Sequence, residues 1–312
     1  MSADIVVGID GSVGAELAWA ADEAVRLAGR LVLVHASSVV DSAAYSSATL
    51  AMMRADASGY GNRVLGEASS AVAARHPELP VSTVLRHQRP ADVLIELSGP
   101  QSIVVVGSHG GNRLSGALLG SVSQRVAAHA AGTVVVVGDR PHRGQGKQPS
   151  PDREILVGVS DSVGGRAALD FACAEATRRS CRVTAVRAYG VFGRGRHGQI
   201  YAAMPGLRAH EAAVLTGAVA RARAEHPELT IDARLADEEP AEALVAVARD
   251  AELLVLGCRH PDDHWPSRLG PITGTVLHHA PCPVAIVGIP RTIEPDRPVA
   301  GEPAILTPGG SR

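Results

Sequence analysis

Short apolar runs rich in valine and isoleucine alternate along the chain with longer segments that carry one apolar face. In the first half these runs predict strands at Ile5–Ile9, Leu31–Val34, Val81–Leu85, Ile103–Val106 and Thr133–Val137. The segments between them predict a helix capped by Ser12 and helices over Leu50–Arg75, Pro90–Ser98 and Ser121–Ala130. Strands without polar alternation, separated by helices, indicate a parallel sheet covered on both faces. With right-handed crossovers, this predicts a doubly wound α/β fold with a five-stranded parallel sheet.

The second half repeats the first at an offset of 150 residues, from Ile5 to Ile155. IVVGIDGS at 5–12 corresponds to ILVGVSDS at 155–162, and the apolar run ending at Gly107 corresponds to the run ending at Gly257. A repeat period this long is a whole domain. The sequence therefore predicts two tandem domains, residues 1–140 and 154–289. They are joined by a linker at 141–153 and followed by a disordered tail at 290–312, both rich in proline, glycine and charge.

Composition excludes several classes of protein without changing this picture. The 312 residues are 46% hydrophobic and 20% charged, which is enough for two cores. A net charge of −2 and a pI near 6.7 predict no nucleic-acid and no membrane partner. Four cysteines without a CxxC pair indicate a reducing compartment. The acidic N-terminus is unlike a signal peptide, and no apolar run approaches the ~18 residues of a membrane span, so a soluble cytoplasmic protein is expected.

A glycine-rich loop follows the fourth predicted strand of the first copy. Gly107, Gly110, Gly120 and Ser121 form the pattern G-x2-G-x9-G-S between that strand and the next helix. Glycines let backbone N–H groups face an anion, and a helix N-terminus adds positive potential, so this loop predicts a phosphate site. We expect Ser121 to cap the helix and to donate its hydroxyl to a phosphate.

Two charged side chains complete the predicted ligand contacts. Arg113 lies within the loop and can act as a counter-charge to the phosphates. Asp10 ends the first strand and can accept hydrogen bonds from ribose hydroxyls or from the base. Because the carboxyl ends of parallel strands meet at one edge of the sheet, Asp10 and Gly107 are expected to face the same ligand.

This spacing, in this α/β context, resembles the ATP-binding signature of the universal stress protein family, in its tandem, two-domain bacterial form. The resemblance covers both repeats and implies a Rossmann-like fold of the adenine nucleotide alpha hydrolase type. It also implies ATP, with or without Mg²⁺, as the ligand of a regulator in stress or dormancy rather than of an enzyme. The ATP-binding residues that it implies are Gly8, Asp10, Ala36, Gly107, Gly110, Gly120 and Ser121, with Ser108, His109, Gly111, Asn112, Arg113, Val122 and Ser123 nearby.

The second copy departs from this pattern. It keeps a degenerate site at Gly158, Ala188, Gly257 and Gly270. Ser160 replaces Asp10, His260 replaces Gly110, and Pro271 replaces Ser121. Pro271 has neither an N–H nor a hydroxyl, so two phosphate donors are lost. We therefore expect weak or no ATP binding in the second copy and one nucleotide per chain.

Three hypotheses about function stay open at this stage. The first is an ATP-binding regulator. The second is a weak ATPase or nucleotide-processing enzyme of a related α/β superfamily, against which the DGSVG sequence after the first strand argues. No residue is predicted to be catalytic; His109 is the nearest candidate base, and slow ATP hydrolysis stays open. The third is a ligand-free dimerisation scaffold. No metal site is predicted, because the histidines and aspartates at 260–264 lie within one loop.

The last strand of each copy is expected to lie at a sheet edge. An uncovered edge of apolar residues tends to pair with another strand. The family resemblance implies pairing through this strand, so we expect Thr133–Val137 and Pro283–Val287 to pair in a pseudo-two-fold unit. A further homodimer of whole chains stays open.

Overall fold

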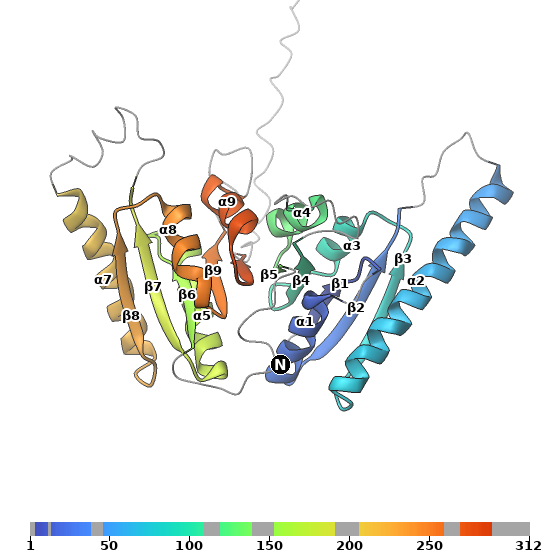
Figure 1. The fold of residues 1–312 in the computed structure, drawn as a ribbon, viewed down its shortest axis with the longest axis horizontal. Helices are drawn as coiled ribbons and strands as arrows, with labels where there is room; N and C mark the ends of the chain where they lie inside the picture. The colour runs from blue at the N-terminus through green and yellow to red at the C-terminus, as the bar shows by residue number, and fades with distance from the viewer. Residues whose placement is uncertain are drawn as a thin grey trace, which may run out of the picture.

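The computed structural model describes residues 4–11, 14–38, 46–108, 119–138, 153–190, 206–258 and 269–288, and it confirms the predicted α/β fold class (Figure 1). The first half contains β1 (Asp4–Gly8), α1 (Ala15–Arg26), β2 (Arg30–Ala36), α2 (Ser47–Arg75), β3 (Val81–Arg86), α3 (Pro90–Glu96), β4 (Ile103–Gly107), α4 (Ser121–His129) and β5 (Thr133–Val137). The second half contains β6 (Glu154–Gly158), α5 (Val163–Arg179), β7 (Arg182–Ala188), α7 (Leu207–Glu225), β8 (Ile231–Ala236), α8 (Pro240–Val247), a short 3-10 turn (Ala248–Asp250), β9 (Leu253–Gly257), α9 (Pro271–His279) and β10 (Val284–Val287).

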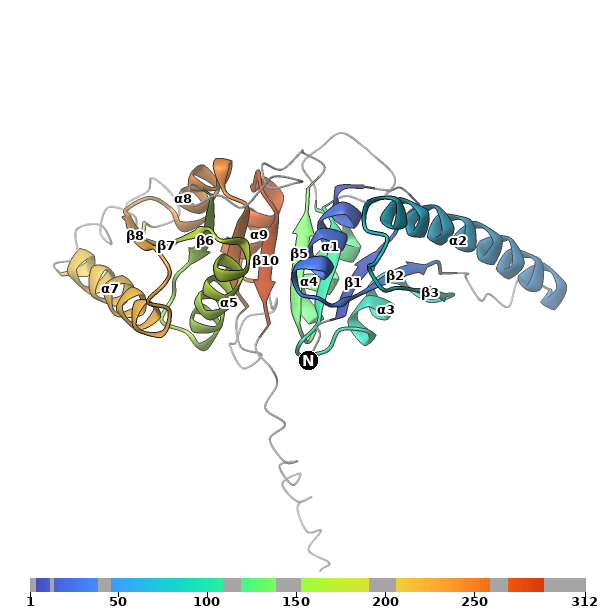
Figure 2. The same cartoon turned by 90° about the horizontal axis from the view of Figure 1, so that it is seen from below.

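All the described strands belong to one ten-stranded sheet, in the order β3-β2-β1-β4-β5-β10-β9-β6-β7-β8. The pairing is parallel within each half and antiparallel between β5 and β10. Figure 2 shows these two strands side by side at the centre of the molecule. Val135 pairs with Ala285, which lies 150 residues later, so a local two-fold axis passes between equivalent residues of the two copies.

Each half winds its helices over both faces of the sheet. Alternate strand residues point to opposite sides, so Ile5 and Val7 pack with α1 and α2 while Val6 packs with α3 and α4. The second half repeats this arrangement, with α5 and α7 on one face and α8 and α9 on the other. Both apolar cores continue across the seam between β5 and β10, and no described helix is long and apolar enough to cross a membrane.

Four helix ends differ from the sequence prediction, and the smallest difference is that α4 ends at His129 rather than Ala130. α2 begins at Ser47 rather than Leu50, because the hydroxyl of Ser46 accepts from the amide of Thr49 at 3.1 Å and caps the helix. α3 ends at Glu96 rather than Ser98. α1 begins after Gly14, so Ser12 is not its N-cap, whereas the equivalent Ser162 does cap α5. His109–Arg113, the loop at 260–264, the tail and the linker before Arg153 lie outside the described residues.

A buried group of charged side chains joins the two halves on the α1 and α5 face. The guanidinium of Arg179 on α5 donates to Glu23 on α1 at 2.5 Å and to Glu175 at 3.1 Å, and it lies 5.5 Å from the ring of Trp19. The side chains of Arg179 and Glu23 are only 4% and 0% exposed. Removing either partner would leave a buried charge without its counter-charge, which is costly. This contact therefore stabilises the observed position of α1 relative to α5.

Glu175 is expected to carry a proton near neutral pH. Burial and the negative charge of Glu23 raise its pKa to about 7, against the opposing effect of the positive charge of Arg179. Burial also acts to raise the pKa of Glu23, but the positive charges of Arg179 and Arg26 outweigh it and lower that pKa below its usual value. Of the two carboxyl groups, Glu175 is therefore the one that carries the proton.

Replacing Glu175 with glutamine should remove a pH dependence of stability. Between pH 4.5 and about 7 the folded protein keeps a proton on Glu175 that the unfolded chain has lost, so the free energy of unfolding falls as pH rises. Urea unfolding at pH 5 and pH 8 measures this change. From pH 5 to pH 8 the free energy of unfolding of wild type should fall by on the order of 2 kcal/mol more than that of Glu175→Gln. For Glu67→Gln, on the exposed side of α2, the free energy of unfolding should change with pH as it does in wild type. The same pH dependence in both variants would contradict the assignment of the proton to Glu175.

Candidate functional site

The carboxyl ends of β1 and β4 meet where the strand order of the first half reverses. β1 pairs with β2 on one side and with β4 on the other, so helices leave the sheet in opposite directions at this point. Crevices at such a reversal are where open α/β sheets bind ligands. The exposed Asp10 follows β1, and the half-buried Gly107 ends β4, so two of the predicted residues lie at this edge.

The start of α4 is fastened to the end of β4 by hydrogen bonds. The amide of Gly120 donates to the carbonyl of Ser108 at 2.8 Å, and the hydroxyl of Ser123 donates to the carbonyl of Gly107 at 2.6 Å. The amide of Ser108 in turn donates to the carbonyl of Val137 on β5 at 2.8 Å. Ser108 and Ser123 therefore join the start of α4 to the end of β4, and the hydroxyl of Ser123 is engaged in this contact.

Two expectations about α4 need correction. Gly120, not Ser121, is the N-cap residue, and no side chain caps this helix. The Gly120 amide is also engaged with Ser108, so it does not face a ligand. The donors that remain are the amides of Ser121, Val122 and Ser123, which have no hydrogen-bond acceptor among the described residues. Three adjacent amides at a helix N-terminus form an anion-binding surface.

An aromatic side chain that the sequence analysis missed lies beside Asp10. Gly11 has a φ of +127°, and a Cβ there would collide with the hydroxyl of Tyr60 on α2. The Tyr60 ring contacts His35 edge to face at 5.6 Å, and the guanidinium of Arg63 lies 5.4 Å from the Tyr60 ring. Tyr60 therefore covers the turn after β1, next to Asp10, which is predicted to bind the ribose or the base.

His35 on β2 contacts both Ile9, after β1, and Tyr60 on α2. Its Nδ1 hydrogen-bonds the carbonyl of Ile9 at 2.8 Å, which makes it the donor and leaves the buried Nε2 without a partner in the described part of the chain. Gly61 on α2 allows the close approach of the helix, because a Cβ there would clash with Leu85 and His35. The sequence Gly59-Tyr60-Gly61 inside a helix is the signal that could have identified Tyr60, since glycine is unfavourable in a helix without a packing reason.

The remaining described candidates have local structural roles of their own. A Cβ on Gly8 would lie 3.1 Å from the side chain of Leu94, so packing of α3 on β1 is enough to explain this glycine. Ala36 ends β2 half-buried, paired with Arg86 on β3. In the second copy, Gly158 resembles Gly8, because a Cβ there would clash with Leu256.

Gly257, the counterpart of Gly107 in the second half, lies against the start of α5. The backbone of Gly164 at the start of α5 lies so close to Gly257 that a Cβ on Gly257 would clash with its carbonyl group. Gly164 likewise lies against the carbonyl of Cys258. Pro271 is the first residue of α9, where Ser121 stands in α4, so one of the helix amides is missing.

In the second half an ion pair takes the place of His35 and its contacts. Arg187, the counterpart of His35, donates to Glu211 on α7 at 2.5 Å and to the carbonyl of Val159 at 3.1 Å. Ala188, the predicted counterpart of Ala36, is half-buried beside this pair at the end of β7. Gly270 keeps its place as the N-cap of α9. Among the described residues, the carboxyl edge of the second half therefore differs from that of the first at the counterparts of Asp10, His35 and Ser121.

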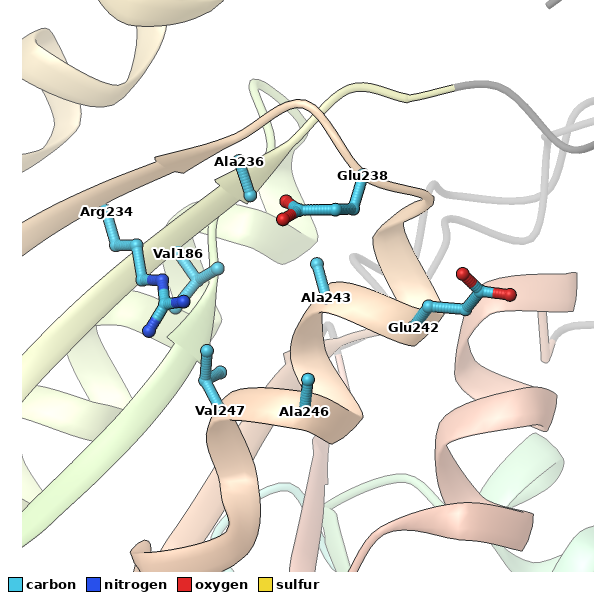
Figure 3. Close-up of a pocket in the computed structure, with 8 residues that line it drawn as sticks. All are labelled: Val186, Arg234, Ala236, Glu238, Glu242, Ala243, Ala246 and Val247. Atoms are coloured by element: carbon cyan, nitrogen blue, oxygen red, sulfur yellow. The ribbon is translucent and has the colours of Figure 1, made fainter.

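A cavity of about 210 Å³ lies elsewhere in the second half, between β7, β8 and α8 (Figure 3). Its apolar surface includes Val186, Ala243 and Val247, and Arg234 and Glu238 lie at its rim. Figure 3 shows Glu238 pointing toward Ala236 and Glu242 pointing away from the cavity. The cavity borders the first turn of α8, but two of its residues are acidic and the amide of Glu242 already donates to the side chain of Glu239, so it is poorly suited to a polyphosphate.

Comparison with known proteins gives one consistent family. A family model described as the universal stress protein family matches residues 1–138 and 153–288. A universal stress protein of Mycobacterium tuberculosis is 29% identical over 292 residues, with 91% of this chain and 96% of that protein covered. A universal stress protein of Mycolicibacterium smegmatis is 28% identical, with the same coverage of both. The crystal structure of a universal stress protein from Archaeoglobus fulgidus matches with a TM-score of 0.63 at 16% identity, covering 93% of this chain and 98% of that chain, and shows the likeness of fold.

If Gly257 is a packing glycine, adding a methyl group there should destabilise the protein. Gly257→Ala pushes the start of α5 away from β9, which should cost about 1–3 kcal/mol. Gly217→Ala is the matched control, because this exposed position on α7 has no atom within 4 Å of the added Cβ, and it should stabilise by up to about 1 kcal/mol. Denaturant unfolding measures both. A neutral Gly257→Ala variant would show that α5 does not close this edge.

Proposed function

Because the family model matches both halves of the chain, the protein belongs to the universal stress protein family, and we propose that its first half binds ATP. In this proposal the protein is a nucleotide-dependent regulator in stress or dormancy, and ATP is a ligand rather than a substrate. The ATP site consists of the carboxyl edge at Asp10 and Ala36, the signature residues Gly107, Gly110, Gly120 and Ser121, and the loop residues between them.

One observation carries the proposal. The amides of Ser121, Val122 and Ser123 stand together at the start of α4, on the strand edge that also carries Asp10. These amides suit the phosphates, because they combine hydrogen-bond donors with the positive end of a helix. Asp10 suits the ribose hydroxyls, and Tyr60 offers an aromatic face for the base.

The difference between the two halves supports one nucleotide per chain. In the second half Ser160 stands where the first half has Asp10, and the backbone of Gly164 lies against Gly257. Where the first half has His35 and Gly61, the second has the Arg187 and Glu211 ion pair. ATP in the second half would also lack the N–H and the hydroxyl that Ser121 offers in the first, since Pro271 has neither.

The proposed setting follows from the same features. We assign the domains to residues 1–140 and 154–289, with ATP in the first domain. All four cysteines are free, which suits the reducing cytoplasm. No group of three or more metal-binding side chains occurs in the described segments, so a bound Mg²⁺ would be held mainly by the phosphates. A ligand-free scaffold or a slow ATPase is the alternative, and the three amides of α4 favour a ligand over a scaffold.

Ser121→Pro tests the proposal, because it gives α4 the first residue that α9 already has. Proline at this position is compatible with a helix, so the fold should be kept while one amide and one hydroxyl are lost. Isothermal titration of the full chain with ATP should give one site in wild type and an affinity about 10- to 100-fold lower in Ser121→Pro.

The reverse substitution, Pro271→Ser, is the control for the second half. It restores the donors at the start of α9 but leaves Gly257 covered by α5, so the number of sites should remain one per chain. Two equivalent sites in wild type would contradict the proposed asymmetry, and unchanged affinity in Ser121→Pro would mean that the phosphates do not bind at α4.

A further inference from the structure

A histidine of the second half forms a hydrogen bond with the first half next to the proposed ATP site. The amide of Leu119 donates to Nδ1 of His278 on α9 at 3.0 Å. Since Nδ1 accepts, the proton of the neutral imidazole lies on Nε2. Leu119 directly precedes Gly120, the N-cap of α4. The bond therefore connects the second half to the start of α4, whose amides are proposed to bind the phosphates.

Leu119 is held from several directions, and one of them comes from the other half. Its side chain is 6% exposed and packs in the core shared by α4 and α9. Its carbonyl accepts from the side chain of Gln124 at 3.1 Å, and the following amide of Gly120 donates to Ser108. The bond to His278 satisfies the backbone N–H of this buried residue, and leaving such a donor unpaired is costly.

The same side-chain contact cannot form in the opposite direction. The residue equivalent to His278 in the first half, 150 positions earlier, is Ala128, which has no side-chain acceptor. The neighbouring His129 bonds within its own helix, to the carbonyl of Arg125 at 2.9 Å. The second half therefore contacts the residue before α4 in the first half through His278. Ala128 of the first half cannot make the same contact with the second half.

We infer that the second half acts as a support for the ATP site of the first, with His278 as the positioning residue. This inference rests on the proposed ATP site. The imidazole fixes the position of Leu119, and through it the direction of the amides of Ser121, Val122 and Ser123. Nucleotide binding and the position of α9 are consequently coupled, so a partner or modification that moves α9 changes ATP affinity, and ATP in turn stabilises the seam.

Three substitutions at His278 test this role through the geometry of the acceptor. Asparagine can place its Oδ1 where Nδ1 lies, whereas glutamine places its oxygen nearer to the Nε2 position, and alanine has no acceptor. Titration of the full chain with ATP should give an affinity close to wild type for His278→Asn. His278→Gln and His278→Ala should bind about five- to tenfold more weakly, as expected for loss of one hydrogen bond at the site. His279→Ala, at the exposed neighbouring residue, should bind like wild type.

A second readout does not depend on the nucleotide. Hydrogen exchange of the Leu119 amide in the ATP-free protein should be slow in wild type and His278→Asn and fast in His278→Gln and His278→Ala. If wild type binds ATP and all His278 variants bind it equally, the supporting role is wrong and the ATP site stands. If wild type binds no ATP, the proposed function fails and the supporting role fails with it. Equal exchange of Leu119 in all variants overturns the inference as well.

Discussion

The antiparallel pairing of β5 with β10 is the constraint on which the rest of the molecule depends. Every residue of both strands is buried, so neither half could leave this edge open to water without exposing a valine-rich surface. Pairing equivalent residues, Val135 with Ala285, brings the two copies together around a local two-fold axis. As a result α4 faces α9 near this axis, which places His278 beside Leu119.

The buried charges on the other face of the sheet fix the same arrangement in a different way. An apolar seam tolerates small shifts, because apolar contacts have little direction. The guanidinium of Arg179 can satisfy Glu23 and Glu175 together only when α1 and α5 hold one relative position. A proton on Glu175 lowers the electrostatic cost of burying the two carboxyl groups together, so the seam combines apolar area with one directional contact.

The sequence was sufficient to predict the elements and the repeat, because both depend on local patterns. Runs such as Ile103–Val106 can only be buried strands in a sheet covered on both faces, and the 150-residue offset requires two copies of one domain. The glycine and serine spacing indicated where a phosphate could bind, before any geometry was available. The family assignment followed from these features and is confirmed by the family model.

Contacts between distant segments could not be predicted in the same way. Tyr60 lies in the middle of a long helix, and only the folded chain brings it to Gly11. His278 has no motif, and its partner is 159 residues away in the sequence. The role of Ser121 was misjudged by one position, since the choice between N-cap and first helical residue depends on the bond from Gly120 to Ser108. Glycines such as Gly8 and Gly257 have packing roles that their spacing alone does not reveal.

We propose that the start of α4 binds the phosphates of ATP and that the start of α9, its copy in the same sheet, does not. Residue-resolved amide hydrogen exchange with and without ATP tests it directly. The account predicts that ATP slows exchange at Ser121, Val122 and Ser123 and leaves the amides of Ile272 and Thr273 on α9 unchanged. Equal protection at the start of both helices, or no protection at α4, would contradict it.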